Sequence, residues 1–180
     1  MRILLTALLF GSCLRAQDNV NPQTAALQEF EKRIEDYMSL SKNLAKGLST
    51  TKPTTEPQVI LDRQSEFAHK IREARRKAKP GDIFTPEISK EFRRLLAFAR
   101  AGQNDSDVKK SLARAEPVRL ILHVNETYPA SVPLQSTPPS ILMNLPRLPP
   151  ELEYRIIGRT LTLRDSVANI VVDLMPDAIP

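Results

Sequence analysis

The spacing of apolar residues in the first half of the chain constrains the fold more than any other feature. Between residues 27 and 48 they recur every three or four positions, which places them on one stripe of a helix, and residues 60–78 repeat the rhythm. The first stripe consists of Leu27, Phe30, Ile34, Tyr37, Ser41, Leu44 and Leu48, and the second of Ile60, Gln64, Phe67, Ile71, Ala74 and Ala78. Two seams of about three heptads joined by a short linker predict an antiparallel helical hairpin at the lower limit of a coiled coil.

Turn-forming and capping residues set the expected bounds of the helices. Gly47 ends the first stripe and Pro80 follows the second. Thr85 precedes Pro86 and Glu87. The Thr85 hydroxyl can cap a helix, the φ angle of Pro86 suits the first helical position, and the Glu87 carboxylate would lie near the positive end of the helix dipole, so a helix is expected to start here. Gly102 ends that helix. Helices are therefore expected over residues 23–47, 57–79, 86–101 and 105–115.

The composition changes near residue 117. Ten of the 15 prolines lie in residues 116–180, and this stretch contains no lysine. Four segments there, residues 118–124, 152–157, 160–165 and 170–174, alternate apolar and polar residues as half-buried strands do. In the last three, one face is expected to carry Leu152, Tyr154, Ile156, Leu161, Leu163, Ile170, Val172 and Leu174. The chain is thus predicted to be α+β, with a helical hairpin or small bundle in residues 17–115 and a small proline-rich antiparallel β meander in residues 116–180.

The first sixteen residues have the parts of a secretory signal peptide in their usual order. Arg2 supplies the charge, a short apolar run follows, and small residues lead to Ala16. The run is far shorter than the roughly 20 residues that span a bilayer, so cleavage after Ala16 would leave no transmembrane anchor. Alternatively, residues 9–13 resemble a lipoprotein box that would leave Cys13 acylated. Cys13 is the only cysteine, which suits a bacterial periplasmic or secreted protein without disulfides.

A basic stretch at residues 69–79 is the one segment that suggests a binding surface. Four cations fall on one flank of the second apolar stripe when it is projected on a helix: Arg72, Arg75, Arg76 and Lys79. At about 1 kcal/mol each, they would hold an anionic envelope polymer or lipid with only millimolar affinity. Nucleic acid is not an expected partner of an exported chain. We favour the simpler interpretation, a solvated helix face.

No residue constellation indicates catalysis, a cofactor or a metal site. The chain has no nucleophile elbow, phosphate-cradling loop, dinucleotide fingerprint or zinc helix. His69 and His123 are its only histidines, and a transition-metal site needs several ligands that converge. Asp165 and Asp173 could pair as acid and base, but turn formation and edge protection are the simpler roles for them.

The C-terminal meander resembles known sequences. The matching residues are Leu148 to Arg155, Gly158, Arg159, Leu161, Leu163, Asp165 and Val171 to Asp173. This pattern resembles the tail of uncharacterised exported bacterial proteins and is more distantly similar to the C-terminal strands of the periplasmic nickel/cobalt-homeostasis regulator family. The resemblance implies a bacterial envelope setting. It does not carry metal handling to this chain, which lacks clustered imidazole and thiolate ligands.

These features together predict a non-catalytic exported envelope protein that binds an unknown protein partner or a second copy of itself. The first alternative is a binder of anionic envelope polymer or lipid through the basic stretch. The second and less favoured alternative is an unrecognised hydrolase-type enzyme with a pocket near Tyr154, Arg155, Asp165 or His123.

Overall fold

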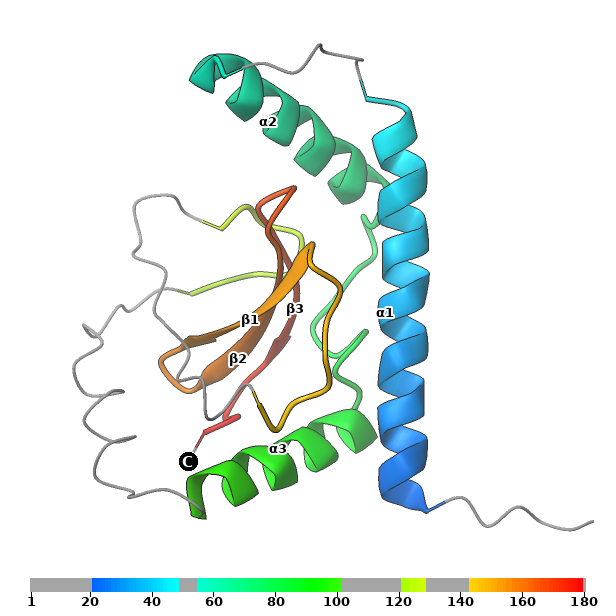
Figure 1. Cartoon of the computed structure of the whole chain (residues 1–180), viewed down its shortest axis with the longest axis vertical. Helices are drawn as coiled ribbons and strands as arrows, with labels where there is room; N and C mark the ends of the chain where they lie inside the picture. Colours follow the sequence, from blue (N-terminus) through cyan, green and yellow to red (C-terminus); the bar gives the residue numbers. More distant parts are fainter. Residues whose placement is uncertain (1–20, 49–54, 102–120, 129–142, 180) are drawn as a thin grey trace, which may run out of the picture.

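The computed structural model describes residues 21–48, 55–101, 121–128 and 143–179 (Figure 1). Three helices are followed by a three-stranded antiparallel sheet, so the predicted α+β class is confirmed. The elements are α1 (Pro22–Lys46), α2 (Pro57–Ala74), α3 (Pro86–Ala101), β1 (Leu152–Ile157), β2 (Thr160–Asp165) and β3 (Ile170–Met175). The expected signal peptide, Cys13 and the helix expected over 105–115 lie outside the described residues. No helix in the described ranges is long and apolar enough to span a membrane.

Local signals in the sequence account for the ends of α1 and the start of α3. Asn21 Oδ1 accepts the Gln23 N–H at 3.0 Å and so caps α1. α1 ends at Lys46, and Gly47 follows it. Each of the three helices begins with proline, which lacks the N–H that would be unsatisfied in a first turn. The expected helices at 23–47 and 86–101 are therefore confirmed to within one residue.

The apolar stripe of α1 packs against the sheet and α3. Figure 1 shows α1 along one side of the sheet, with α3 below and α2 above. The ring of Phe30 lies 4.8 Å from that of Phe92, and the ring of Phe92 lies 6.1 Å from that of Tyr154. Each such side chain stabilises the fold by about 1.5–3 kcal/mol when fully buried. The first predicted stripe is thus a core face, but its main partner is not α2.

The hairpin prediction needs correction for α2. α2 runs back in the opposite sense to α1, as expected, but crosses it obliquely (Figure 1). The buried residues of α2 are Phe67, Ala68 and Ile71, all in its C-terminal half. The second seam of about three heptads is therefore wrong in its first half, because only the C-terminal half of α2 reaches the core that the helices and the sheet share.

α2 also ends earlier than expected. The helix stops at Ala74, not at residue 79, and Arg75 already has a non-helical backbone. The side chain of Arg75 turns into the body of the protein, and the chain then bends towards α3. This end depends on contacts with distant segments, so local turn signals did not reveal it.

The three strands pair in the order β1, β2, β3. Leu152 lies opposite Asp165 in β1 and β2, and Leu161 lies opposite Met175 in β2 and β3. Gly158 has a φ of 59° in the first turn, a conformation that glycine adopts without strain. The strands expected at 152–157, 160–165 and 170–174 are confirmed to within one residue.

A β-bulge in β3 reverses the expected alternation. Leu163 lies opposite Asp173 while Arg164 lies opposite Val171, which leaves Val172 as the extra residue. As a result Leu174 packs with Val171 on the face turned away from the helices, so its expected placement with Ile170 and Val172 is wrong. The same bulge turns Asp173 towards the helices.

Residues 121–128 lie on the side of the sheet turned away from α1 (Figure 1). The Asn125 N–H donates to Val171 O at 2.9 Å, and the Tyr128 N–H donates to Asn169 O at 3.0 Å. The strand expected over 118–124 is wrong for residues 121–124, which form no strand, and residues 118–120 lie outside the described part. A turn closed by the Glu126 N–H and His123 O shifts the pairing with β3 to residues 125–128.

Candidate functional site at the two ends of helix α2

Asp173 holds the segment between α2 and α3 on the sheet. Its carboxylate accepts the N–H groups of Gly81 at 2.9 Å, Ile83 at 2.7 Å, Phe84 at 2.7 Å and Leu174 at 2.8 Å. The side chain is fully buried, and burial raises the pKa of its carboxyl while the four hydrogen bonds oppose the rise. This one side chain therefore binds three of the backbone N–H groups of residues 81–84.

Arg75 ties the end of α2 to three other segments. Its Nη2 donates to Val172 O at 3.0 Å, and its Nη1 donates to Asn125 Oδ1 at 3.1 Å. The guanidinium carbon lies 5.2 Å from the centre of the Tyr37 ring on α1. Burial lowers the pKa of Arg75, and Tyr37, Asp173 and Asp82 oppose that change. Arg75 is thus a structural residue.

Asp165 holds α1 on the sheet in a similar way. Its carboxylate accepts the Tyr37 hydroxyl at 2.8 Å and the N–H groups of Val167 at 2.9 Å and Ala168 at 2.8 Å. Burial and then the charge of Asp165 raise the pKa of Tyr37. The turn-forming role expected for Asp165 is confirmed. The edge-protecting role expected for Asp173 is wrong, because its side chain is fully buried, as is that of Asp165. Asp165 binds α1, and Asp173 binds the segment between α2 and α3.

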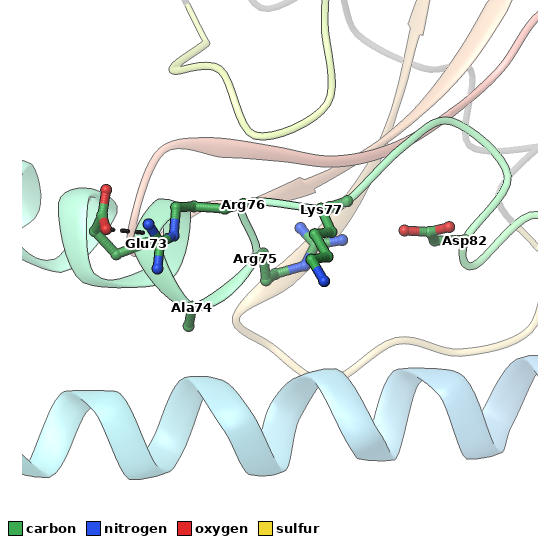
Figure 2. Close-up of a pocket in the computed structure, with 7 residues that line it drawn as sticks. Glu73, Ala74, Arg75, Arg76, Lys77 and Asp82 are labelled. Atoms are coloured by element: carbon green, nitrogen blue, oxygen red, sulfur yellow. Dashed lines mark ion pairs between the residues drawn. The ribbon is translucent and has the colours of Figure 1, made fainter.

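A hollow of about 430 Å³ opens where α2 ends (Figure 2). It is lined by Glu73, Ala74, Arg75, Arg76, Lys77, Ala78 and Asp82, and we call it the basic hollow. The Arg76 side chain is 76 % exposed and its Nε lies 3.6 Å from a Glu73 carboxylate oxygen. Figure 2 shows this ion pair at one side of the hollow and Asp82 at the other.

The four cations expected to bind anions do not form one helix flank, because the helix ends at Ala74. Arg72 is half-buried and its Nε donates to Ala68 O at 3.3 Å. The guanidinium of Arg75 already contacts Val172, Asn125 and Tyr37. Arg76 and Lys79 are exposed, and only Arg75 and Arg76 of the four line the basic hollow. Lys77 lines it too, although a helical projection places it on the opposite flank.

The N-terminal half of α2 exposes apolar side chains. Ile60 is 52 % exposed and Leu61 is 55 % exposed. Gln64, one turn further on, donates through Nε2 to Val167 O at 3.0 Å, and Val167 is itself half-exposed in the turn between β2 and β3. We call Ile60, Leu61 and Val167 the α2 patch. The sequence pattern indicated a core position for Ile60, and no local signal showed where the core would end.

Metal-binding side chains do not cluster in the described ranges. No three His, Cys, Asp or Glu side chains there could share a metal ion. His69 and His123 are both exposed. Tyr154 is buried, and its hydroxyl donates to Pro146 O at 3.1 Å. Tyr154, Asp165 and His123 do not line the basic hollow.

Comparison with known proteins identifies no relative. No protein-family model matches the chain, and no curated protein or solved structure matches it. Its function is therefore inferred from its residues and their contacts.

Proposed function

We propose that this chain is a non-catalytic protein of the bacterial envelope, periplasmic or secreted, that acts by binding another protein through the α2 patch. One observation carries this proposal: the apolar stripe of α2 continues beyond the core to Ile60, which is about half exposed, and the neighbouring Leu61 is about half exposed too. A few well-packed, desolvated residues near the centre of an interface supply most of its binding energy. A stable interface buries about 800 Å² on each partner, so the α2 patch would be its centre and polar neighbours its rim.

The rigid placement of α2 supports this proposal. Phe67 and Ile71 are buried in the core, and Arg75 fastens the helix to Val172 and Asn125. A binding surface on a rigid element loses little conformational entropy when the partner binds. The patch is thus held in place by the other half of the same helix.

The export part of the proposal rests on the leader of residues 1–16 and on the resemblance of the C-terminal strands. Mass spectrometry of the N-terminus in the producing cell tests it. We expect the chain to begin at Gln17. An acylated Cys13 would support the lipoprotein route, and an intact Met1 in the cytosolic fraction would contradict export.

A photo-crosslinking amino acid at position 61 tests the binding surface. We expect one dominant adduct in envelope extracts, lost when Ile60→Asp places a charge in the α2 patch. Met143→Asp is the matched control, since Met143 is also exposed but lies outside the α2 patch. An adduct with the mass of two chains would identify self-association. No adduct, or one that Ile60→Asp leaves unchanged, would contradict the proposal.

The basic hollow supports a second candidate function, binding of anionic envelope polymer or lipid. The exposed Arg76 and Lys77 line it, and Lys79 is exposed nearby. Glu73, Asp82 and the negative end of the α2 dipole oppose an anion there, so we expect weak binding. Sedimentation with phosphatidylglycerol vesicles should fall steeply with salt and be lost in Arg76→Glu with Lys79→Glu. Binding that ignores salt or these changes would end this candidate.

A further inference from the structure

The sheet face turned away from the helices borders a second hollow, of about 280 Å³. We call it the apolar hollow, and it is lined by Ile121, Leu122, Ile157, Thr160, Leu174 and Pro176. All of these residues except Thr160 are apolar. Ile121 is 79 % exposed and Pro176 is exposed as well, so these lining residues are accessible from solvent. The apolar hollow is therefore suited to apolar side chains that enter from outside.

The α2 patch has apolar side chains of a matching volume. Ile60 and Leu61 are each about half exposed on the convex surface of a helix. Together they carry roughly eight carbon groups, which occupy roughly 240 Å³ at the roughly 30 Å³ that a water molecule takes up in the liquid. The apolar hollow measures about 280 Å³. One chain thus carries both protruding apolar side chains and a hollow that can hold them.

The α2 patch and the apolar hollow lie at opposite ends of the sheet. Val167 of the α2 patch follows β2, whereas Thr160 of the apolar hollow begins it. A strand rises about 3.3 Å per residue, so these ends are roughly 20 Å apart. Figure 1 shows α2 at one end of the sheet and the turn between β1 and β2 at the other. The α2 patch of one molecule therefore cannot fill its own apolar hollow, but that of a second copy can.

The charges beside the apolar hollow have a positive excess. Arg93 Nη2 donates to Pro176 O at 3.0 Å. Arg159, which precedes Thr160, lies with its Nε 3.4 Å from Asp177 Oδ1. The charged side chains that contact or adjoin Pro176 and Thr160 are thus two guanidinium groups and one carboxylate. They leave one excess positive charge at this end of the molecule.

The charges beside the α2 patch have the opposite excess. Glu56 and Asp62 lie on either side of Ile60 and Leu61 in the sequence, and Arg63 is the one cation within residues 56–63. All three charged side chains are exposed, and together they leave one excess negative charge. Opposite charges around two matching surfaces steer an association and fix its orientation. Charge therefore favours contact between the α2 patch of one copy and the apolar hollow of another.

We propose that the α2 patch of one copy docks in the apolar hollow of a second copy, so that the protein assembles head to tail. This inference rests on the proposed function of the α2 patch and names its partner, a second copy of this chain. Each contact leaves one α2 patch and one apolar hollow unused at the two ends of the assembly. Such contacts between two different surfaces continue into rings or filaments.

Sedimentation velocity of the purified protein at rising concentration tests the proposal. The mean mass should rise beyond that of two chains. Ile60→Asp places a charge in the α2 patch and Ile121→Asp places one in the apolar hollow, so each should weaken self-association at least tenfold. Both positions are exposed, so both variants should keep the fold. Met143→Asp is the matched control at another exposed apolar position and should assemble as the unaltered protein does.

A charge reversal tests the orientation. Asp62→Lys should weaken self-association about threefold, because it removes the negative excess beside the α2 patch. Glu31→Lys makes the same change of charge at an exposed position of α1 and should have no effect. Equal effects of the two variants would contradict the charge match between the two surfaces.

A mixture of the two blocked variants distinguishes head-to-tail assembly from other kinds. Ile60→Asp keeps an intact apolar hollow and Ile121→Asp keeps an intact α2 patch. Mixed in equal amounts, they should form a species of two chains and nothing larger, although each alone stays monomeric. If Ile121→Asp alone forms dimers, the α2 patches bind each other and the proposal is overturned.

A strictly monomeric unaltered protein would also overturn the head-to-tail proposal. If the crosslinker at position 61 then captures one different protein, the proposed function of the α2 patch stands and only this inference fails. If position 61 gives no adduct at all, both fail.

Discussion

The two halves of α2 carry the same apolar stripe but lie in different surroundings. In the C-terminal half Phe67 and Ile71 are buried, and Arg75 fastens the helix end to the sheet. In the N-terminal half Ile60 and Leu61 are exposed. The difference teaches that the helical rhythm decides which side chains share a stripe, while the extent of the shared core decides how much of that stripe is buried. Stability is expected to reside in one half and binding in the other.

The largest expected effect compares one apolar truncation in each half. Phe67→Ala should lower the free energy of unfolding by about 3–5 kcal/mol, because it leaves a cavity in the core. Ile60→Ala should lower it by less than about 1 kcal/mol, since that side chain already contacts water. Urea unfolding followed by circular dichroism measures both. Similar losses of stability in the two variants would contradict the difference in burial between the two halves of α2.

Removal of the Asp173 carboxylate tests how residues 81–84, which follow the buried half of α2, are attached to the sheet. Asp173→Ala should cost about 3 kcal/mol or more, because it leaves the buried N–H groups of residues 81–84 without their acceptor. Asp36→Ala, at an exposed position of α1, is the control and should change stability by less than about 0.5 kcal/mol. If Asp173→Ala lowers the free energy of unfolding by less than about 1 kcal/mol in the same urea unfolding, the attachment of residues 81–84 does not depend on this carboxylate.

Two neighbouring arginines sharpen the comparison further. Arg75→Gln should lower the free energy of unfolding by about 2 kcal/mol, because it removes charged hydrogen bonds to Val172 and Asn125. Arg76→Gln should change it by less than about 0.5 kcal/mol, since its ion pair with Glu73 is exposed. Thermal unfolding of the two variants side by side gives the contrast. Equal effects would contradict the structural role of Arg75.

The smallest effect is expected at Tyr37. Tyr37→Phe removes the hydroxyl that donates to Asp165 and keeps the ring that Arg75 contacts. A loss of about 1 kcal/mol in urea unfolding is expected, because Asp165 keeps its bonds to Val167 and Ala168. A loss as large as that of Asp173→Ala would mean that α1, rather than the segment after α2, is the critical attachment.

The sequence predicted those parts of the fold that local chemistry determines. Gly47, Thr85 and Pro86 bound helices that form where expected, and strict alternation set β1 and β2. The early end of α2 was not predictable, because Arg75 is held by residues 50 and 97 positions further along the chain. The same holds for Asp173, whose backbone partners in the segment before α3 lie 89 to 92 positions earlier.

The candidate site was predictable only in part. The basic stretch correctly indicated exposed cations at Arg76 and Lys79, but Arg75 is used by the fold. The exposure of Ile60 was missed, since a stripe of apolar residues shows no mark where the core stops covering it. The bulge at Val172 was missed for a related reason: alternation alone does not show where a strand takes up an extra residue.

Native-state hydrogen exchange along α2 tests the division of this helix most directly. Amides of residues 67–74 should exchange only through global unfolding, because this half of α2 has its side chains buried in the core and its end held by Arg75. Amides of residues 61–65 should exchange at least about 100-fold faster, through local opening of the exposed half. Uniform protection from residue 61 to residue 74 would contradict the account.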